Sequence, residues 1–63
     1  MDYPYNAITN KLAELINIGG NNTSVKAGTP ITVHGEDGKY GTVCLNGLNR
    51  CGAMLRADYT AAK

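Results

Sequence analysis

The chain has 63 residues and a net charge of +1, and charged side chains make up only 17% of it. This length suits one small domain, residues 1–63, which buries only about 60% of its unfolded surface and often needs a crosslink or a partner. The near-neutral charge argues against a strong field for polyanions. No apolar run approaches the roughly 18 residues of a membrane span, so we expect no membrane partner.

A helix is predicted over residues 4–18. Its apolar residues recur at intervals of three and four, the spacing of a single helix face: Tyr5, Ile8, Leu12, Leu15 and Ile16. Pro4 suits the first helical position, where its missing N–H is not needed. The glycines at 19–20 are typical of a helix end.

The following segment, 19–29, is predicted to be a loop because it is rich in Gly, Asn, Thr and Ser. Val25 is its single apolar anchor and a candidate start of a short strand over 24–27. The glycines do not form a phosphate-binding loop, which requires a strand before it and a helix after it. No nucleotide cofactor is expected.

A β-hairpin is predicted over residues 30–46, because apolar and polar residues alternate in both halves. A three-residue loop Glu36-Asp37-Gly38 fits the turn, since its third position needs a positive φ that Gly tolerates. This loop would pair Val33 with Gly41. The register then places four apolar side chains on one face: Ile31, Val33, Val43 and Leu45.

Residues 49–59 fit either a third strand or a C-terminal helix. The turn signal Asn46-Gly47 precedes them and Gly52 interrupts them, and both features favour the strand. A three-residue loop over 46–48 would place Cys51 opposite Val43, on the apolar face. We therefore predict an α+β fold, with the N-terminal helix packed on a three-stranded antiparallel meander. The alternative is a helix, a β-hairpin and a C-terminal helix.

The two cysteines, Cys44 and Cys51, are predicted to be free thiols. The predicted register puts them on opposite faces of the sheet, which argues against a disulfide. Their spacing also differs from the Cys pairs of structural zinc sites, so we expect no metal. Free thiols and the lack of a signal-like N-terminus indicate a cytoplasmic or other intracellular, non-secreted protein, with a virion as a further location.

No catalytic residues are predicted. A nucleophile would need a base and an orienting carboxylate beside it. His34 and Cys44 would share an open sheet face without a pocket, and the carboxylates are scattered along the chain. A non-enzymatic protein is therefore expected.

The sheet face opposite the helix is the predicted partner-binding surface. It combines aromatic, apolar and polar side chains suited to contact with another protein. Its residues are His34, Tyr40, Thr42, Cys44, Met54 and Arg56. The same face could stack unpaired bases, but the chain lacks a basic cluster, so nucleic acid is not the favoured partner.

The segments 28–33 and 41–43 resemble the Gly/Val rhythm of SH3-like barrel strands. The resemblance covers less than a third of the chain and carries no functional residues with it.

These observations predict a structural or interaction protein, a small subunit that binds a protein surface or its own copies in a larger assembly, such as a viral or phage accessory protein. The low charge and the small core favour assembly. A small nucleic-acid-binding regulator and a small protein inhibitor are the alternatives.

Overall fold

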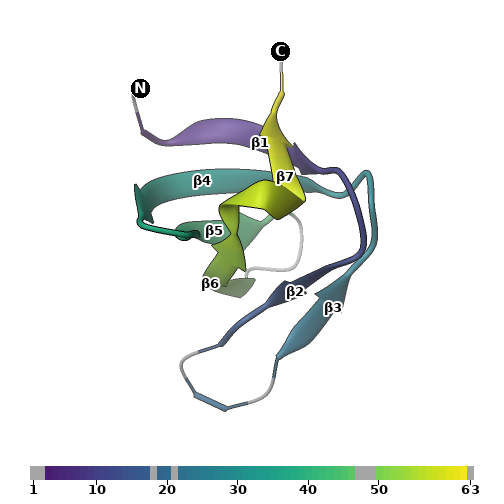
Figure 1. Cartoon of the computed structure of the whole chain (residues 1–63), viewed down its shortest axis with the longest axis vertical. Helices are drawn as coiled ribbons and strands as arrows, with labels where there is room; N and C mark the ends of the chain where they lie inside the picture. The colour runs from purple at the N-terminus through teal and green to yellow at the C-terminus, as the bar shows by residue number, and fades with distance from the viewer. Residues whose placement is uncertain (1–2, 18, 21, 47–49, 63) are drawn as a thin grey trace.

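The computed structural model describes residues 3–17, 19–20, 22–46 and 50–62, which form an almost entirely β structure (Figure 1). The elements, in chain order, are β1 (Tyr5–Thr9), β2 (Ala13–Leu15), β3 (Thr23–Val25), β4 (Pro30–Asp37), β5 (Tyr40–Leu45), β6 (Arg50–Leu55), the 3₁₀ helix η1 (Arg56–Asp58) and β7 (Tyr59–Ala61). The predicted α+β fold is therefore wrong. Within the described ranges, no helix has the length and apolar character needed to cross a membrane.

Two antiparallel sheets enclose one core. The larger has the order β6-β5-β4-β1-β7, and β2 pairs with β3 in the smaller one. The end of β2 meets the edge of the larger sheet, because the Ile16 N–H donates to the Ala53 carbonyl at 2.8 Å and the Ala53 N–H donates to the Ile16 carbonyl at 2.9 Å. This bridge makes the fold a partly closed barrel. The segments that resemble SH3-like barrel strands supply half of β4 and half of β5.

The segment predicted as a helix over 4–18 instead forms β1 and β2. Ala7 and Thr9 are buried while Ile8 between them is 43% exposed, which is the period of a strand. Leu12 and Ile16, two further members of the predicted helical face, are also exposed. Asn and β-branched residues are weak helix formers, and pairing of β1 with both β4 and β7 satisfies its backbone.

The segment predicted as a loop over 19–29 contains β3, whose Val25 is buried as expected of an anchor. The segment that connects β3 to β4 is held to Thr9 by hydrogen bonds. The Thr9 hydroxyl donates to the Lys26 carbonyl at 2.6 Å and accepts from the Thr29 N–H at 2.9 Å. These bonds satisfy the one buried polar side chain recorded among the described residues.

The hairpin of β4 and β5 is confirmed, but its predicted register is wrong. Asp37 pairs with Tyr40 across a two-residue turn, in which Gly38 has the predicted positive φ, 62°. The register shifts by one residue at His34, a β-bulge, so that Val33 pairs with Val43. The bulge returns the expected apolar face to the core: Ile31, Val33, Val43 and Leu45 are all buried.

The third strand predicted over 49–59 is confirmed only as far as Leu55, where β6 ends, and its register is one residue away from the predicted one. Residues 56–59 instead form η1 and the start of β7. Gly52 rather than Cys51 lies opposite Val43, and Leu45 pairs with Arg50. Since a one-residue slip exchanges the two faces of a strand, Met54 is buried and Cys51 is exposed. The predicted loop over 46–48 falls largely outside the described residues.

Cys44 and Cys51 form a disulfide, which corrects the prediction of free thiols. The actual register makes them directly opposed residues of β5 and β6, on the same face. The argument against a disulfide rested on the register that placed them on opposite faces.

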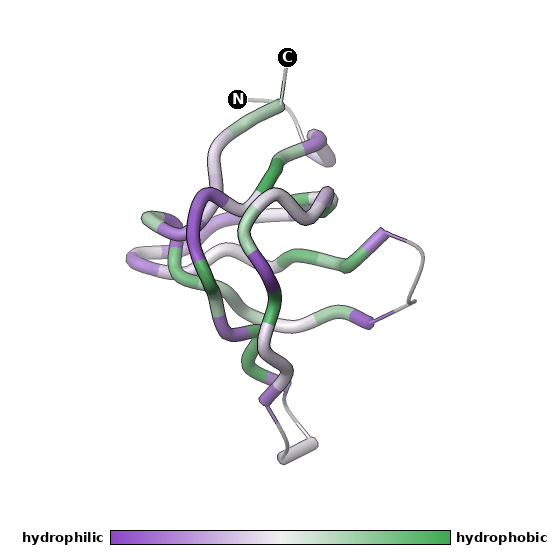
Figure 2. Tube along the Cα trace, turned by 90° about the vertical axis from the view of Figure 1, so that its right-hand side faces the viewer, coloured by the Kyte–Doolittle hydropathy of each residue, from purple (hydrophilic) through white to green (hydrophobic). Residues whose placement is uncertain are grey.

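The core lies between the two sheets, and every strand contributes to it. Hydrophobic and hydrophilic stretches alternate along the chain trace, as expected for strands with one buried face (Figure 2). The buried hydrophobic residues are Ala7, Ala13, Leu15, Val25, Ile31, Val33, Val43, Leu45, Met54 and Tyr59.

Candidate functional site

A single carboxylate, that of Glu36, gathers four side chains at one end of the barrel. Its Oε1 accepts the Tyr3 hydroxyl at 2.7 Å. Its Oε2 accepts the hydroxyls of Tyr59 at 2.7 Å and Tyr5 at 3.0 Å, and lies 3.4 Å from the Arg56 Nε. The cluster joins β1, β4, η1 and β7, which are far apart in the sequence.

The bulge at His34 is what turns Glu36 inward. Beyond the bulge, Glu36 pairs with Gly41, which is buried. A Cβ on Gly41 would overlap the Tyr59 hydroxyl. Because Gly41 has no side chain, the Tyr59 hydroxyl can occupy this space and reach Glu36.

Hydrogen bonds set the charge of the cluster. The hydroxyls of Tyr59 and Tyr3 lower the pKa of Glu36 to about 2, against a partial opposition from burial. Burial, together with the Glu36 carboxylate, raises the pKa of Tyr59. Glu36 is therefore a carboxylate whose oxygens are already occupied by donors, and it is a poor proton acceptor for chemistry at neutral pH.

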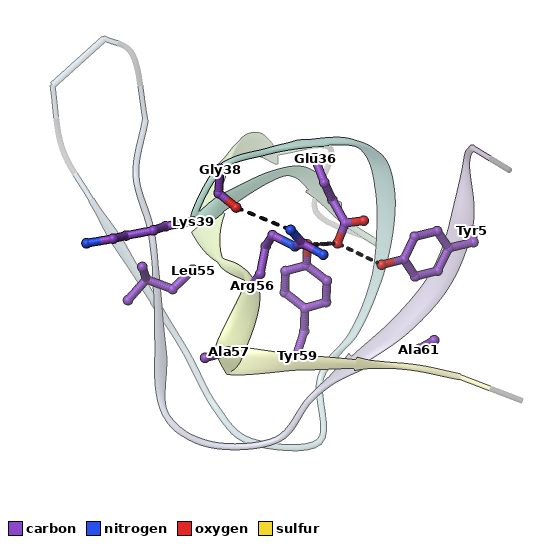
Figure 3. A pocket seen from close by; sticks show the side chains of 9 residues that line it. All are labelled: Tyr5, Glu36, Gly38, Lys39, Leu55, Arg56, Ala57, Tyr59 and Ala61. Atoms are coloured by element: carbon purple, nitrogen blue, oxygen red, sulfur yellow. Dashed lines mark hydrogen bonds and ion pairs between the residues drawn. The ribbon is translucent and has the colours of Figure 1, made fainter. Parts of the chain in front are cut away.

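Next to this cluster lies an open groove of about 560 Å³ (Figure 3). Its walls come from the start of β1, the end of β4, the following turn, the end of β6, η1 and β7. The residues lining it are Tyr5, Glu36, Gly38, Lys39, Leu55, Arg56, Ala57, Tyr59 and Ala61. Most of these side chains present carbon to the groove, and its charged groups are Glu36, Lys39 and Arg56.

The turn after β4 is tied to η1 across the groove. The Arg56 N–H donates to the Lys39 carbonyl at 2.8 Å, and the Arg56 Nη1 donates to the Gly38 carbonyl at 3.2 Å. Arg56 thus contacts both Glu36 and the turn, as the dashed lines in Figure 3 show. A groove held by such contacts is largely pre-formed, which lowers the entropy cost of binding.

An exposed apolar pair continues the groove onto the outer face of the barrel. Leu55 is 40% exposed and Tyr40 is 42% exposed. They are direct cross-strand partners on β6 and β5. Together with the groove, they form a surface on which aromatic and aliphatic groups meet solvent.

The structure separates the six residues predicted to bind a partner. Tyr40, Thr42 and Cys44 alternate along β5, with Cys44 in the disulfide. Met54 is fully buried, so it cannot contribute to a surface. His34 is the exposed bulge residue of β4, and Arg56 lies in η1 at the groove.

Tyr3, Tyr5, Glu36 and Tyr59 were missed as site residues from the sequence alone. Tyr5 and Tyr59 were assigned to a helix face and to a third strand or helix, and Glu36 to the turn itself. The one available signal was composition: a chain without Trp or Phe has four tyrosines, and three of them bind this carboxylate.

No cluster of three or more metal-ligating side chains occurs among the described residues. No family model, curated protein or solved structure matches the chain. The function is therefore inferred from the chemistry of the groove and the surface beside it.

Proposed function

We propose that the chain is a non-enzymatic interaction protein whose groove binds a segment of a partner protein. The carrying observation is the open groove between η1, β7 and the turn after β4, lined mainly by tyrosine, leucine and alanine carbon. Grooves of several hundred Å³ with apolar walls and a few polar groups are the usual form of a binding site. A role as a small subunit of a larger assembly, such as a viral or phage particle, agrees with this surface.

The chemistry of the groove supports binding rather than catalysis. Its one carboxylate is saturated by three hydroxyls and an arginine. A catalytic base needs a pKa near the working pH, whereas the pKa of Glu36 is about 2. No Ser, Cys, Thr or His is among the residues that line the groove in the part of the chain that the structure describes.

The disulfide is relevant to the compartment in which the chain functions. Disulfides persist in oxidising environments, which include the surfaces of virions and cells. Because Cys44 and Cys51 are joined, we propose that the chain functions in such an environment, rather than as an intracellular protein with free thiols. Differential alkylation of the two cysteines in protein from its native source tests this.

Affinity capture from the cells that produce the protein tests the proposed function. Three baits are compared, each with and without nuclease and at low and high salt: the wild type, Leu55→Ser and Ile8→Ser. Ile8 is a matched control, because its exposure of 43% is close to the 40% of Leu55 and it does not line the groove. We expect the wild type and Ile8→Ser to retain a protein through nuclease and high salt, and Leu55→Ser to retain several-fold less.

Nuclease-sensitive and salt-sensitive recovery would instead favour the nucleic-acid-binding regulator. Equal capture by Leu55→Ser and the wild type would show that the groove is the wrong surface. A captured enzyme whose activity falls on binding would identify the inhibitor alternative, and recovery of the same chain would identify a homo-oligomer.

A further inference from the structure

We infer that the partner segment carries an acidic side chain next to an aliphatic or aromatic one. This inference rests on the proposed function, because it concerns the same groove. The observation that carries it is the unequal pairing of the charges that line the groove: its carboxylate is fully occupied and one of its two cations is not.

The pairing can be followed residue by residue. Among the described residues that line the groove, Glu36 is the single acidic one, and Arg56 and Lys39 are the two basic ones. Arg56 lies against the Glu36 carboxylate, so these two charges compensate each other. Lys39 makes no side-chain hydrogen bond or ion pair within the described residues, so the lining carries a net charge of +1 that a ligand can neutralise.

The position of Lys39 places this charge beside the apolar surface. Its backbone carbonyl is fixed by the Arg56 N–H at 2.8 Å. The next residue, Tyr40, is the cross-strand partner of Leu55, which itself lines the groove. A segment that buries an aliphatic or aromatic side chain against Leu55 would therefore hold a neighbouring carboxylate within reach of the Lys39 ammonium group.

The ligand carboxylate would not meet repulsion from Glu36. The side chain of Glu36 is only 10% exposed, and its charge is spread over three hydroxyls and a guanidinium. Arg56, in contrast, is 52% exposed. Two of its five N–H groups account for its contacts with Glu36 and Gly38, which leaves further N–H donors for a ligand.

A nucleic acid suits this groove less well. Binding to single strands relies on several aromatic faces and on a positive channel along the backbone. Tyr59 is only 6% exposed and its hydroxyl is committed to Glu36. A single uncompensated lysine offers little attraction to a phosphate chain.

Fluorescence anisotropy with the purified chain tests the inference. The probes are a labelled, capped peptide of alternating glutamate and leucine, the same peptide with glutamine in place of glutamate, and a short oligothymidylate. We expect the wild type to bind the glutamate peptide about two- to fivefold more tightly than the glutamine peptide, as for an exposed ion pair. Higher salt should reduce this ratio.

Two lysine variants locate the charge effect. Lys39→Gln should bring the ratio between the two peptides close to one. Lys26→Gln, which removes the same charge from an exposed lysine outside the groove, should leave the ratio unchanged. Circular dichroism and thermal unfolding of both variants should match the wild type, because neither side chain makes a hydrogen bond or an ion pair within the described residues.

The outcomes separate this inference from the proposed function. Leu55→Ser should weaken both peptides equally. A wild-type ratio of one, with binding still lost in Leu55→Ser, would overturn the acidic preference and leave the groove as the binding site. Peptide binding that is unaffected by Leu55→Ser would overturn both. An oligothymidylate that binds more tightly than either peptide would replace the protein segment with a nucleic acid.

Discussion

The inward position of the Glu36 side chain results from one extra residue in β4, the bulge at His34. With regular alternation from Val33, the side chain of residue 36 would point outward, on the face opposite the core. Because His34 is a bulge, Gly35 pairs with Thr42 and Glu36 pairs with the buried Gly41. Bulges commonly redirect a side chain in this way. The sequence pattern predicted the positive φ of Gly38, but no local signal marked the bulge.

The Glu36 cluster should make stability depend on pH in a defined direction. The pKa of Glu36 falls from an ordinary value of 4.5 to about 2 on folding. A lowered pKa contributes stability that is present above the unfolded value and is lost as the pH falls through the folded one. We therefore expect the free energy of unfolding, measured with urea, to decline between about pH 4.5 and pH 2.

Glu36→Gln isolates this contribution. The amide has no charge, and it replaces one of the two acceptor oxygens with an NH2 donor that faces donating hydroxyls, so we expect a loss of about 1–3 kcal/mol at neutral pH. The variant should also lose most of the decline between pH 4.5 and pH 2. A decline of unchanged size in Glu36→Gln would assign the acid sensitivity to another carboxylate.

At the scale of elements, the strands of the hairpin were predictable and their registers were not. Ile31 and Val33 alternate with Thr32 and His34, and Val43 and Leu45 alternate with Thr42 and Cys44. This alternation identifies both strands and their buried face. The register depends on whether the turn has two residues or three, and here a shorter turn and a bulge compensate each other. In β6 the register error is not compensated. The predicted register is one residue off, so it places Cys51 in the core and Met54 on the surface, the reverse of what is found.

The helix error has a related cause. The helical period is met by Tyr5, Ile8, Leu12, Leu15 and Ile16. Residues 5–9 also fit a strand, because Tyr5, Ala7 and Thr9 then lie on one side of it. Which pattern forms is decided by β4 and β7, which pair with β1 from distant positions in the sequence. Local sequence propensity does not identify those pairing partners.

Gly52 offers a test of how β2 is held against β6. A Cβ on residue 52 would overlap the Ile16 carbonyl oxygen, whose bond with the Ala53 N–H forms part of the bridge. We expect Gly52→Ala to lower the free energy of unfolding by about 2 kcal/mol. It should also speed amide hydrogen exchange at Ile16 and Ala53.

Gly35→Ala is the matched control for Gly52→Ala. Gly35 is likewise a strand glycine with no positive φ, but nothing lies within 4 Å of an added Cβ there. Its effect should stay within about 0.5 kcal/mol. Equal losses in the two variants would mean that the close approach of Ile16 does not limit residue 52.

At the scale of the whole molecule, a 63-residue barrel must be stabilised by a small core. Ten buried hydrophobic residues of the described ranges form that core, and domains of this size are marginal without further constraints. The fold supplies three: the Thr9 bonds, the Glu36 cluster and the disulfide. Each adds a side-chain link between segments that the backbone pairing already brings together, and the Glu36 cluster also shapes the groove.

The disulfide should contribute stability without deciding the fold. Cys44 and Cys51 close a loop with a sequence separation of 7, for which the chain-entropy model gives about 2 kcal/mol. Both lie on the face away from the core, and β5 pairs with β6 through six residue pairs, of which theirs is one. Cys44→Ala/Cys51→Ala should therefore unfold in guanidinium at a lower midpoint and keep the native circular dichroism spectrum. The wild type under reducing conditions should match this variant, and an unfolded double variant would mean that the crosslink is required for the barrel to form.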